Sequence, residues 1–199
     1  CYPTATLLCL LPLAEAQLVK TRGLIIDAKS GVSGAGRGLK EGNLFCEAAE
    51  GLHPYSVGTH RHAPEIEQEL GLRFGESVRV TFTPHLVPMT RGELVTIYAD
   101  LAEGQTLASV HAALSDRYAT EPFVNVRPLG SLPPDTRHTR GTNRCEIAVF
   151  ADRVEDRVII VGAIDNLIKG SAGQALQNAN LMFGLPEVMG LDFLQPLFP

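Results

Sequence analysis

The sequence predicts a single α+β domain with about five strands and four helices. Some segments alternate apolar and polar residues, as half-buried strands do, and others repeat apolar residues at helical spacing. These segments do not follow a strict strand–helix–strand order, which favours an α+β fold over a doubly wound parallel sheet. No internal repeat, low-complexity segment or linker divides the 199 residues.

The strand signal is clearest from residue 78 onward. We expect strands over 78–82, 93–101, 123–128, 143–150 and 157–164, and 23–30 is a further short apolar run. Strands that follow each other so closely favour antiparallel pairing. The last two are expected to form a hairpin around the charged turn 152–156, whereas 38–58 is expected to be irregular.

The first two helices are expected over 1–16 and from residue 64 onward. Pro3 lies near the first helical position, where its missing N–H costs nothing. Pro64 and the acidic residues after it mark the second helix start, because negative charge suits the first turns of a helix. The expected buried face of the first helix carries Leu7, Leu10 and Leu11.

Two further helices are expected in the second half of the chain. Thr106 is a typical N-cap, and helical periodicity follows it as far as Tyr118. The last helix is expected over 164–182, followed by a loop-like tail to Pro199. Its predicted apolar stripe consists of Ile164, Leu167, Ile168, Ala172, Ala175, Leu176, Ala179 and Met182.

Composition excludes several classes of protein. Hydrophobic residues make up 45% of the chain and charged residues 20%, which is typical of a folded domain rather than a disordered one. The net charge is −5 without any run of Lys or Arg, so we expect no nucleic acid and no anionic membrane as partner. Polar residues interrupt every hydrophobic run, so no membrane span is expected.

The 4 cysteines do not form a C-x-x-C pair, which argues against a structural zinc site. Reduced thiols in a cytoplasmic protein are expected, with Cys9 and Cys145 as small core residues. Cys1 differs because it comes just before a predicted helix. The helix dipole and its unpaired N–H groups favour a thiolate there, which makes Cys1 a candidate nucleophile. The alternative is that Cys1 is simply where the chain begins.

A second candidate cluster is His60, Arg61 and His62, within GTHRHAPEIEQE. The positive end of the following helix would keep His62 neutral and able to act as a base, and Arg61 could hold an anion with two hydrogen bonds. His-x-His is also a metal-ligand pattern, but a third ligand at matching spacing is not evident, so we expect no metal. The alternative is a polar surface loop.

Glycine positions carry the remaining signals. SGVSGAGR, at 30–37, departs from the G-x-G-x-x-G dinucleotide fingerprint, but it suits a loop whose backbone approaches a ligand closely. Gly170 and Gly173 would each weaken the last helix by about 1 kcal/mol relative to Ala, so close packing or a ligand is expected there. The segment 82–93 is expected to be a strand end followed by a rigid loop with His85 and Arg91.

Five segments, in this order, resemble the N-acetyl-gamma-glutamyl-phosphate reductase family: CYPTA, SGVSGAGR, THRHAPEI, FTPHLVPMTRG and IDNLIKGSAGQALQNAN. The similarity extends over nearly the whole chain. It implies an NADPH-dependent enzyme of arginine biosynthesis that is related to aspartate-semialdehyde dehydrogenase. It also implies a mixed, largely antiparallel sheet covered by helices, like the C-terminal catalytic domain of glyceraldehyde-3-phosphate dehydrogenase.

The resemblance implies a role for several residues. Cys1 would attack the acyl phosphate to form a thioester, and His62 would exchange the proton as hydride from NADPH reduces it. The implied roles are catalytic for Cys1 and His62, substrate-binding for Arg61, His60 and Arg91, and cofactor-binding for Ser33, Gly34, Gly36 and Asn166.

Family members carry a dinucleotide-binding Rossmann domain before the catalytic cysteine, and this chain starts at Cys1. The resemblance therefore implies that 1–163 is a catalytic and dimerisation domain, and that 164–199 packs on an absent nucleotide-binding domain. That absent domain would bind most of NADPH, and the chain alone is expected to be inactive. The expected partners are an acyl-phosphate substrate and further copies of the chain, in a dimer or tetramer.

Three alternatives stay open. A close relative could act on the aminoadipyl phosphate of lysine biosynthesis. An N-terminal-nucleophile hydrolase would use Cys1 with its own amine as base, although a strand rather than a helix would then follow Cys1. A non-catalytic interaction domain is the third.

Overall fold

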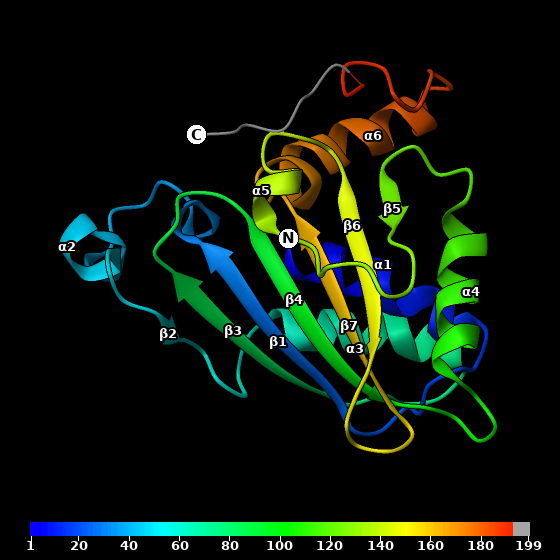
Figure 1. The fold of residues 1–199 in the computed structure, drawn as a ribbon. Coiled ribbons are helices and arrows are strands. Elements are labelled where there is room, and N and C mark those ends of the chain that lie inside the picture. The colour runs from blue at the N-terminus through cyan, green and yellow to red at the C-terminus, as the bar shows by residue number, and fades with distance from the viewer. Residues whose placement is uncertain (193–199) are drawn as a thin grey trace.

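In the computed structural model, which describes residues 1–192, a 7-stranded sheet has the strand order β2-β3-β1-β4-β7-β6-β5 (Figure 1). β1 pairs with β3, and β5 with β6, in parallel, whereas the other four pairs are antiparallel. The predicted α+β fold with a mixed, largely antiparallel sheet is confirmed. The strands are β1 (Leu24–Gly31), β2 (His53–Pro54), β3 (Val80–Val87), β4 (Glu93–Asp100), β5 (Val124–Val126), β6 (Cys145–Ala151) and β7 (Arg157–Ile164).

The predicted hairpin is present as β6 and β7, but β3 extends further than the sequence predicted. It runs to Val87 and includes Pro84, where a loop was expected. The carbonyl of Pro84 accepts a hydrogen bond from the Tyr55 N–H, so the backbone edge of Pro84 that lacks an N–H faces β2. Because β2 has only 2 residues, a missing N–H on that side interrupts little pairing.

Three long helices cover one face of the sheet: α1 (Tyr2–Glu15), α3 (His62–Phe74) and α4 (Leu107–Tyr118). Figure 1 shows the strands in front, with α1 and α3 behind them. Thr106 caps α4 as predicted, and it forms a reciprocal capping box with Ser109. α3 begins at His62 rather than at Pro64, so Pro64 lies inside its first turn, where proline is tolerated.

The last helix begins later than predicted. Ile164 is the final residue of β7, and a π-helical turn, η3 (Ile168–Ala172), precedes α6 (Gly173–Met182). The Asp165 carboxylate accepts hydrogen bonds from the N–H groups of Leu167 and Ile168, which ends the strand and starts the turn. The remaining helical segments are the short α2 (Phe45–Ala48) and α5 (Thr136–Thr139) and the 3-10 turns Val32–Ala35 and Glu41–Asn43.

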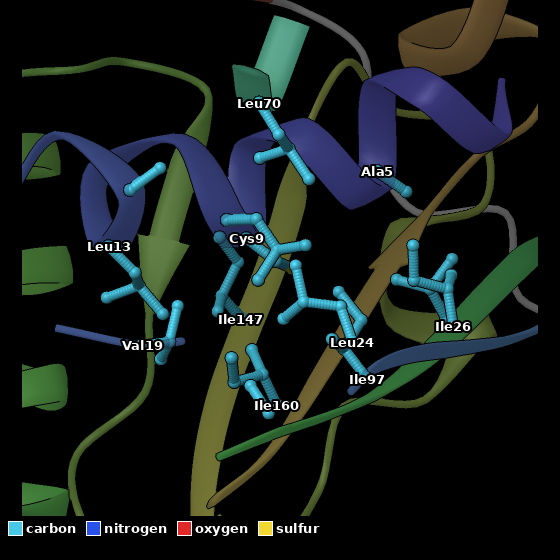
Figure 2. Packing of buried hydrophobic residues seen from close by; sticks show 14 of the residues in the cluster. Ala5, Cys9, Leu13, Val19, Leu24, Ile26, Leu70, Ile97, Ile147 and Ile160 are labelled. Atoms are coloured by element: carbon cyan, nitrogen blue, oxygen red, sulfur yellow. The ribbon is translucent and has the colours of Figure 1, made fainter. Parts of the chain in front are cut away.

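The core lies between the helices and the covered face of the sheet (Figure 2). Cys9 and Cys145 are wholly buried in it, as predicted. A Cβ atom at Gly162 would lie 2.7 Å from Cys9 Sγ, so glycine allows α1 to approach β7 closely. The predicted buried face of α1 was partly wrong, because Leu10 is buried while Leu7 and Leu11 are half-buried. Its buried residues are Tyr2, Pro3, Ala5, Thr6, Cys9, Leu10, Pro12, Leu13 and Ala14.

The apolar stripe predicted for the last helix is mostly exposed, and the helix buries Gly173, Gln177 and Asn180 instead. Leu176 is 42% exposed and Met182 is 82% exposed. The buried amides form hydrogen bonds with the segment that follows α6, which explains why a polar face points inward. The predicted tail lies in part, at 193–199, outside the described residues. Within 1–192, no helix is both long and apolar enough to cross a membrane.

Candidate active site

A cleft of about 540 Å³ opens at the N-terminal end of α1. It brings together five of the residues singled out in the sequence, from three separate segments of the chain: Cys1, Gly34, His60, Arg61 and His62. Sequence reasoning missed other residues that line it, among them Tyr2, His53 and Tyr55. The main candidate residues therefore share one site.

Cys1 is the N-cap residue of α1, as predicted, and its carbonyl accepts the N–H of Ala5 at 3.1 Å. Its side chain is partly exposed to the cleft. The N-terminal N–H groups and the dipole of a 14-residue helix favour negative charge at this point. The placement suits a thiolate nucleophile.

Gly170, in the π-helical turn, packs directly against Cys1. A Cβ atom at residue 170 would overlap Cys1 Cβ and would lie 3.0 Å from Cys1 Cα. Only glycine therefore allows the turn to pack against the nucleophile. The close packing expected at Gly170 is present, and its partner is the candidate catalytic residue.

His60 sits in an aromatic cage beside the cleft. Its ring lies edge-on to Tyr2 and Tyr55, with centroids 5.9 Å and 5.5 Å away. Its Nδ1 accepts the N–H of His62 at 3.2 Å, so that nitrogen carries no proton. Burial lowers the pKa of His60, which keeps the ring neutral. His60 thus orders the start of α3, and its role in substrate binding stays a prediction.

His62 is the first residue of α3, and its Nδ1 lies 2.8 Å from Glu65 Oε2. With Nδ1 engaged by a carboxylate, Nε2 is the ring nitrogen left to exchange a proton in the cleft. The rings of His60 and His62 are 5.0 Å apart, but the residues in 1–192 contain no group of three His, Cys, Asp or Glu that could hold a metal ion. Arg61, between them, is exposed at the cleft mouth.

Two tyrosines, Tyr2 and Tyr55, also line the cleft. The Tyr55 hydroxyl donates to the Tyr2 hydroxyl at 3.2 Å, and the Tyr2 hydroxyl donates to the carbonyl of His85 at 3.3 Å. Burial raises the pKa of both tyrosines, so both hydroxyls stay protonated and can donate.

Two of the predicted cofactor-binding residues, Ser33 and Asn166, are in direct contact, and Gly34 follows Ser33 in the same loop. Asn166 is buried, and its amide donates to Ser33 Oγ at 3.0 Å across 133 residues of sequence. Its side-chain oxygen accepts the N–H of Gly92 at 2.7 Å. Ser33 and Asn166 thereby hold the loop that presents Gly34 to the cleft. Gly36 has a left-handed φ of 78° and faces a neighbouring hollow rather than Cys1.

Arg91 is not among the residues that line the cleft. Its Nη2 lies 2.9 Å from Asp165 Oδ2, and the same carboxylate oxygen accepts the N–H of Gly141. Arg91 therefore holds the residue that starts the π-helical turn carrying Gly170. A direct contact between Arg91 and substrate stays a prediction.

Glu93 is a buried acid that sequence reasoning missed. It begins β4 with 0% exposure, and neither carboxylate oxygen has a hydrogen-bond partner among the described residues. Burial raises the pKa of Glu93 from an ordinary 4.5 to about 8. The alternation of Glu93 with Val95 and Ile97 was the signal that could have placed it on the covered face.

Glu93→Gln is expected to change how stability depends on pH. The folded state keeps a proton that the unfolded chain releases near pH 4.5, so wild-type stability is lost as the pH rises to about 8. Relative to wild type, the variant should gain about 4 kcal/mol between pH 4.5 and 8.5. Guanidinium unfolding at both pH values measures this gain. Glu103→Gln, at an exposed turn, is the control, and an equal pH dependence in all three proteins would contradict the prediction.

Comparison with known protein families identifies the fold. Residues 1–166 match the family described as "Semialdehyde dehydrogenase, dimerisation domain". The chain belongs to this semialdehyde dehydrogenase family. The match includes Cys1, the His60–His62 segment and Asn166, and it ends before the π-helical turn.

The semialdehyde dehydrogenase domain has close relatives among curated proteins. It is 56% identical to the N-acetyl-gamma-glutamyl-phosphate reductase of Rhodospirillum rubrum, over 100% of this chain and 56% of the relative. It is 53% identical to a probable chloroplastic N-acetyl-gamma-glutamyl-phosphate reductase of Arabidopsis thaliana, over 100% of this chain and 49% of the relative. The domain thus spans about half the length of these relatives.

Solved structures share the fold of this semialdehyde dehydrogenase domain. Aspartate semialdehyde dehydrogenase II from Vibrio cholerae matches with a TM-score of 0.71 and 18% identity, over 90% of this chain and 59% of that one. A probable aspartate-semialdehyde dehydrogenase from Pseudomonas aeruginosa matches with a TM-score of 0.71 and 20% identity, over 91% of this chain and 60% of that one. At this identity the likeness concerns the fold. The helix after Cys1 and the family match both contradict the N-terminal-nucleophile alternative.

Proposed function

We propose that this domain is the catalytic part of an N-acetyl-gamma-glutamyl-phosphate reductase of arginine biosynthesis. The observation that carries the proposal is the cleft, which places Cys1 at the positive end of α1 together with Arg61 and His62. Identity of 56% over the whole chain to a curated reductase supports the substrate class. We expect a cytoplasmic enzyme, although one relative is named as chloroplastic.

The first step is acyl transfer to sulfur. The Cys1 thiolate attacks the carbonyl carbon of the acyl phosphate, the C–O bond to phosphate breaks, and inorganic phosphate leaves with the bonding electrons. The N-terminal N–H groups of α1 stabilise the attacking thiolate. Arg61, exposed at the cleft mouth, is placed to pair with the phosphate or carboxylate of the substrate.

The second step reduces the thioester. When bound, NADPH supplies the hydride for this reduction. His62 gives a proton to the oxygen as the carbonyl is reduced, and Glu65 stabilises the protonated ring through Nδ1. His62 then takes the hydroxyl proton back as the C–S bond breaks, which releases the semialdehyde and restores the thiolate.

The loop that contains Ser33 and Gly34 supports a site for the nicotinamide end of the cofactor beside Cys1. Gly34 lines the cleft, and a Cβ there would lie 2.7 Å from Ser30 Oγ, so glycine allows the loop to pack closely against Ser30. Ser33 and Asn166 hold that loop in place. We propose that a separate nucleotide-binding domain holds the rest of NADPH, and that 164–199 packs against it. The exposed apolar residues of α6, including Leu181 and Met182, support such a contact.

We also propose that copies of the chain assemble as a dimer or a larger homo-oligomer. The family description names a dimerisation domain. The face of the sheet opposite α1 and α3 carries half-exposed side chains, among them Lys29, His85 and Tyr98. A sheet face of this kind is suited to burial against a second copy.

The assay that tests the proposed function follows NADPH oxidation and phosphate release by the complete enzyme. With N-acetyl-gamma-glutamyl phosphate, we expect one phosphate released per NADPH oxidised. The aminoadipyl analogue, longer by one methylene, should show a kcat/KM lower by about 10-fold or more. A preference for the aminoadipyl analogue, or phosphate release without NADPH oxidation over many turnovers, would contradict the assignment.

A further inference from the structure

We propose that Glu93 is a positioning residue for the nucleophile: a neutral carboxylic acid behind the cleft whose ionisation slows the reaction at alkaline pH. The inference rests on the proposed role of Cys1. Glu93 does not line the cleft, so it acts through its neighbours and not by touching substrate.

The sheet register places Glu93 directly beneath the site. Its partner on β1 is Ser30, which lines the cleft and interacts with the Tyr2 hydroxyl. Its partner on β7 is Ile164, whose Cδ1 lies 3.2 Å from the position of a Cβ at Gly170. A Cβ at residue 170 would also overlap Cys1 Cβ, so Ile164 lies next to the contact between Gly170 and Cys1. The two strand partners of Glu93 therefore lie beside Tyr2 and Cys1.

The surroundings of Glu93 favour its neutral form. The side chain is wholly buried, and neither oxygen has a hydrogen-bond partner among the described residues. An ionised carboxylate without a donor is costly in such a place. Because burial raises the pKa of Glu93 to about 8, the group is neutral at pH 7 and ionises within the range where a cysteine enzyme can be assayed.

The titratable groups that face Glu93 come from two elements and one loop. They are Tyr2 of α1, Cys145 of β6 and Tyr55 after β2. A negative charge on Glu93 raises the pKa of both cleft tyrosines and of Cys145. The same charge opposes the thiolate of Cys1 and the oxyanion that forms beside it.

The fold does not need an acid at this position. Glu93 alternates with Val95, Ile97 and Ala99 on the covered face of β4, so an apolar side chain would suit the core. A buried acid that lowers stability above pH 4.5 and lies under the nucleophile is more readily explained by function than by packing.

The test compares wild type, Glu93→Gln and Glu103→Gln in the complete enzyme. Alkylation of Cys1 by iodoacetamide is followed from pH 6.5 to 9 by mass spectrometry of the peptide that contains Cys1. The ratio of rate constants at pH 9 and pH 6.5 should be roughly 3- to 10-fold larger in Glu93→Gln than in the other two proteins. The decline of kcat above about pH 8 should likewise move to higher pH in Glu93→Gln alone.

The outcomes separate this inference from the proposed function. Parallel alkylation profiles in all three proteins, or a Glu93→Gln rate that is changed equally at every pH, would overturn the role of Glu93. A Cys1→Ser enzyme that still reduces substrate would overturn the role of Cys1 itself. If Cys1→Ser is inactive while the alkylation profiles stay parallel, only the inference on Glu93 fails.

Discussion

Cys1→Ser in the complete enzyme is expected to lower kcat for acyl-phosphate reduction by about 10³-fold or more. A serine hydroxyl is far less acidic than a thiol, and the N-terminus of α1 offers too little stabilisation to ionise it near neutral pH. The side chains are similar in size, so KM should change by only a few-fold. Steady-state NADPH oxidation measures both constants.

The matched control for this substitution is Cys46→Ser. Cys46 is an exposed thiol in the short helix α2 and does not line the cleft, so this variant should keep wild-type turnover. If Cys1→Ser retained more than about a tenth of wild-type kcat, a thioester at Cys1 would not be on the reaction path.

Gly170→Ala is expected to lower kcat by about 10²-fold although residue 170 carries no reactive group. The new methyl group would overlap Cys1 Cβ and would meet Ile164 Cδ1 at 3.2 Å, so either the nucleophile or the π-helical turn must move. A displacement of about 1 Å at a nucleophile is enough for a loss of this size. Turnover and the alkylation rate of Cys1 should fall together, because the thiol itself is displaced.

Gly38→Ala is the control for the glycine substitution. A Cβ atom at Gly38 would have nothing within 4 Å, so an added methyl group there should leave turnover unchanged. A Gly170→Ala enzyme with wild-type kcat and wild-type alkylation rate would show that the close contact at Cys1 has no bearing on the chemistry.

Local signals in the sequence located the parts of the site that depend on short-range structure. Pro3 and the apolar run after it predicted the helix that follows Cys1, and Thr106 predicted the start of α4. The His60–His62 segment was recognised because it comes just before a helix start. These features depend on residues within one or two turns, so the sequence alone can reveal them.

Contacts between distant segments could not be read in this way. Tyr55 lies in a region expected to be irregular, and it reaches Tyr2 across 53 residues of sequence. Gly170 was expected to pack closely, but its partner Cys1 follows only from the fold. The polar buried face of α6 was missed because the helix also carries apolar residues at helical spacing, which suggested a buried apolar stripe. Within residues 1–192 most of these apolar residues are exposed.

Trapping the acyl-enzyme tests the central claim most directly. The complete enzyme is mixed with N-acetyl-gamma-glutamyl phosphate in the absence of NADPH, quenched in acid and digested for mass spectrometry. We expect the N-acetylglutamyl group on the peptide that contains Cys1, with one phosphate released per site and with loss of the adduct when NADPH is added before the quench. An unmodified Cys1 peptide after full phosphate release, or the acyl group on another residue, would contradict the account.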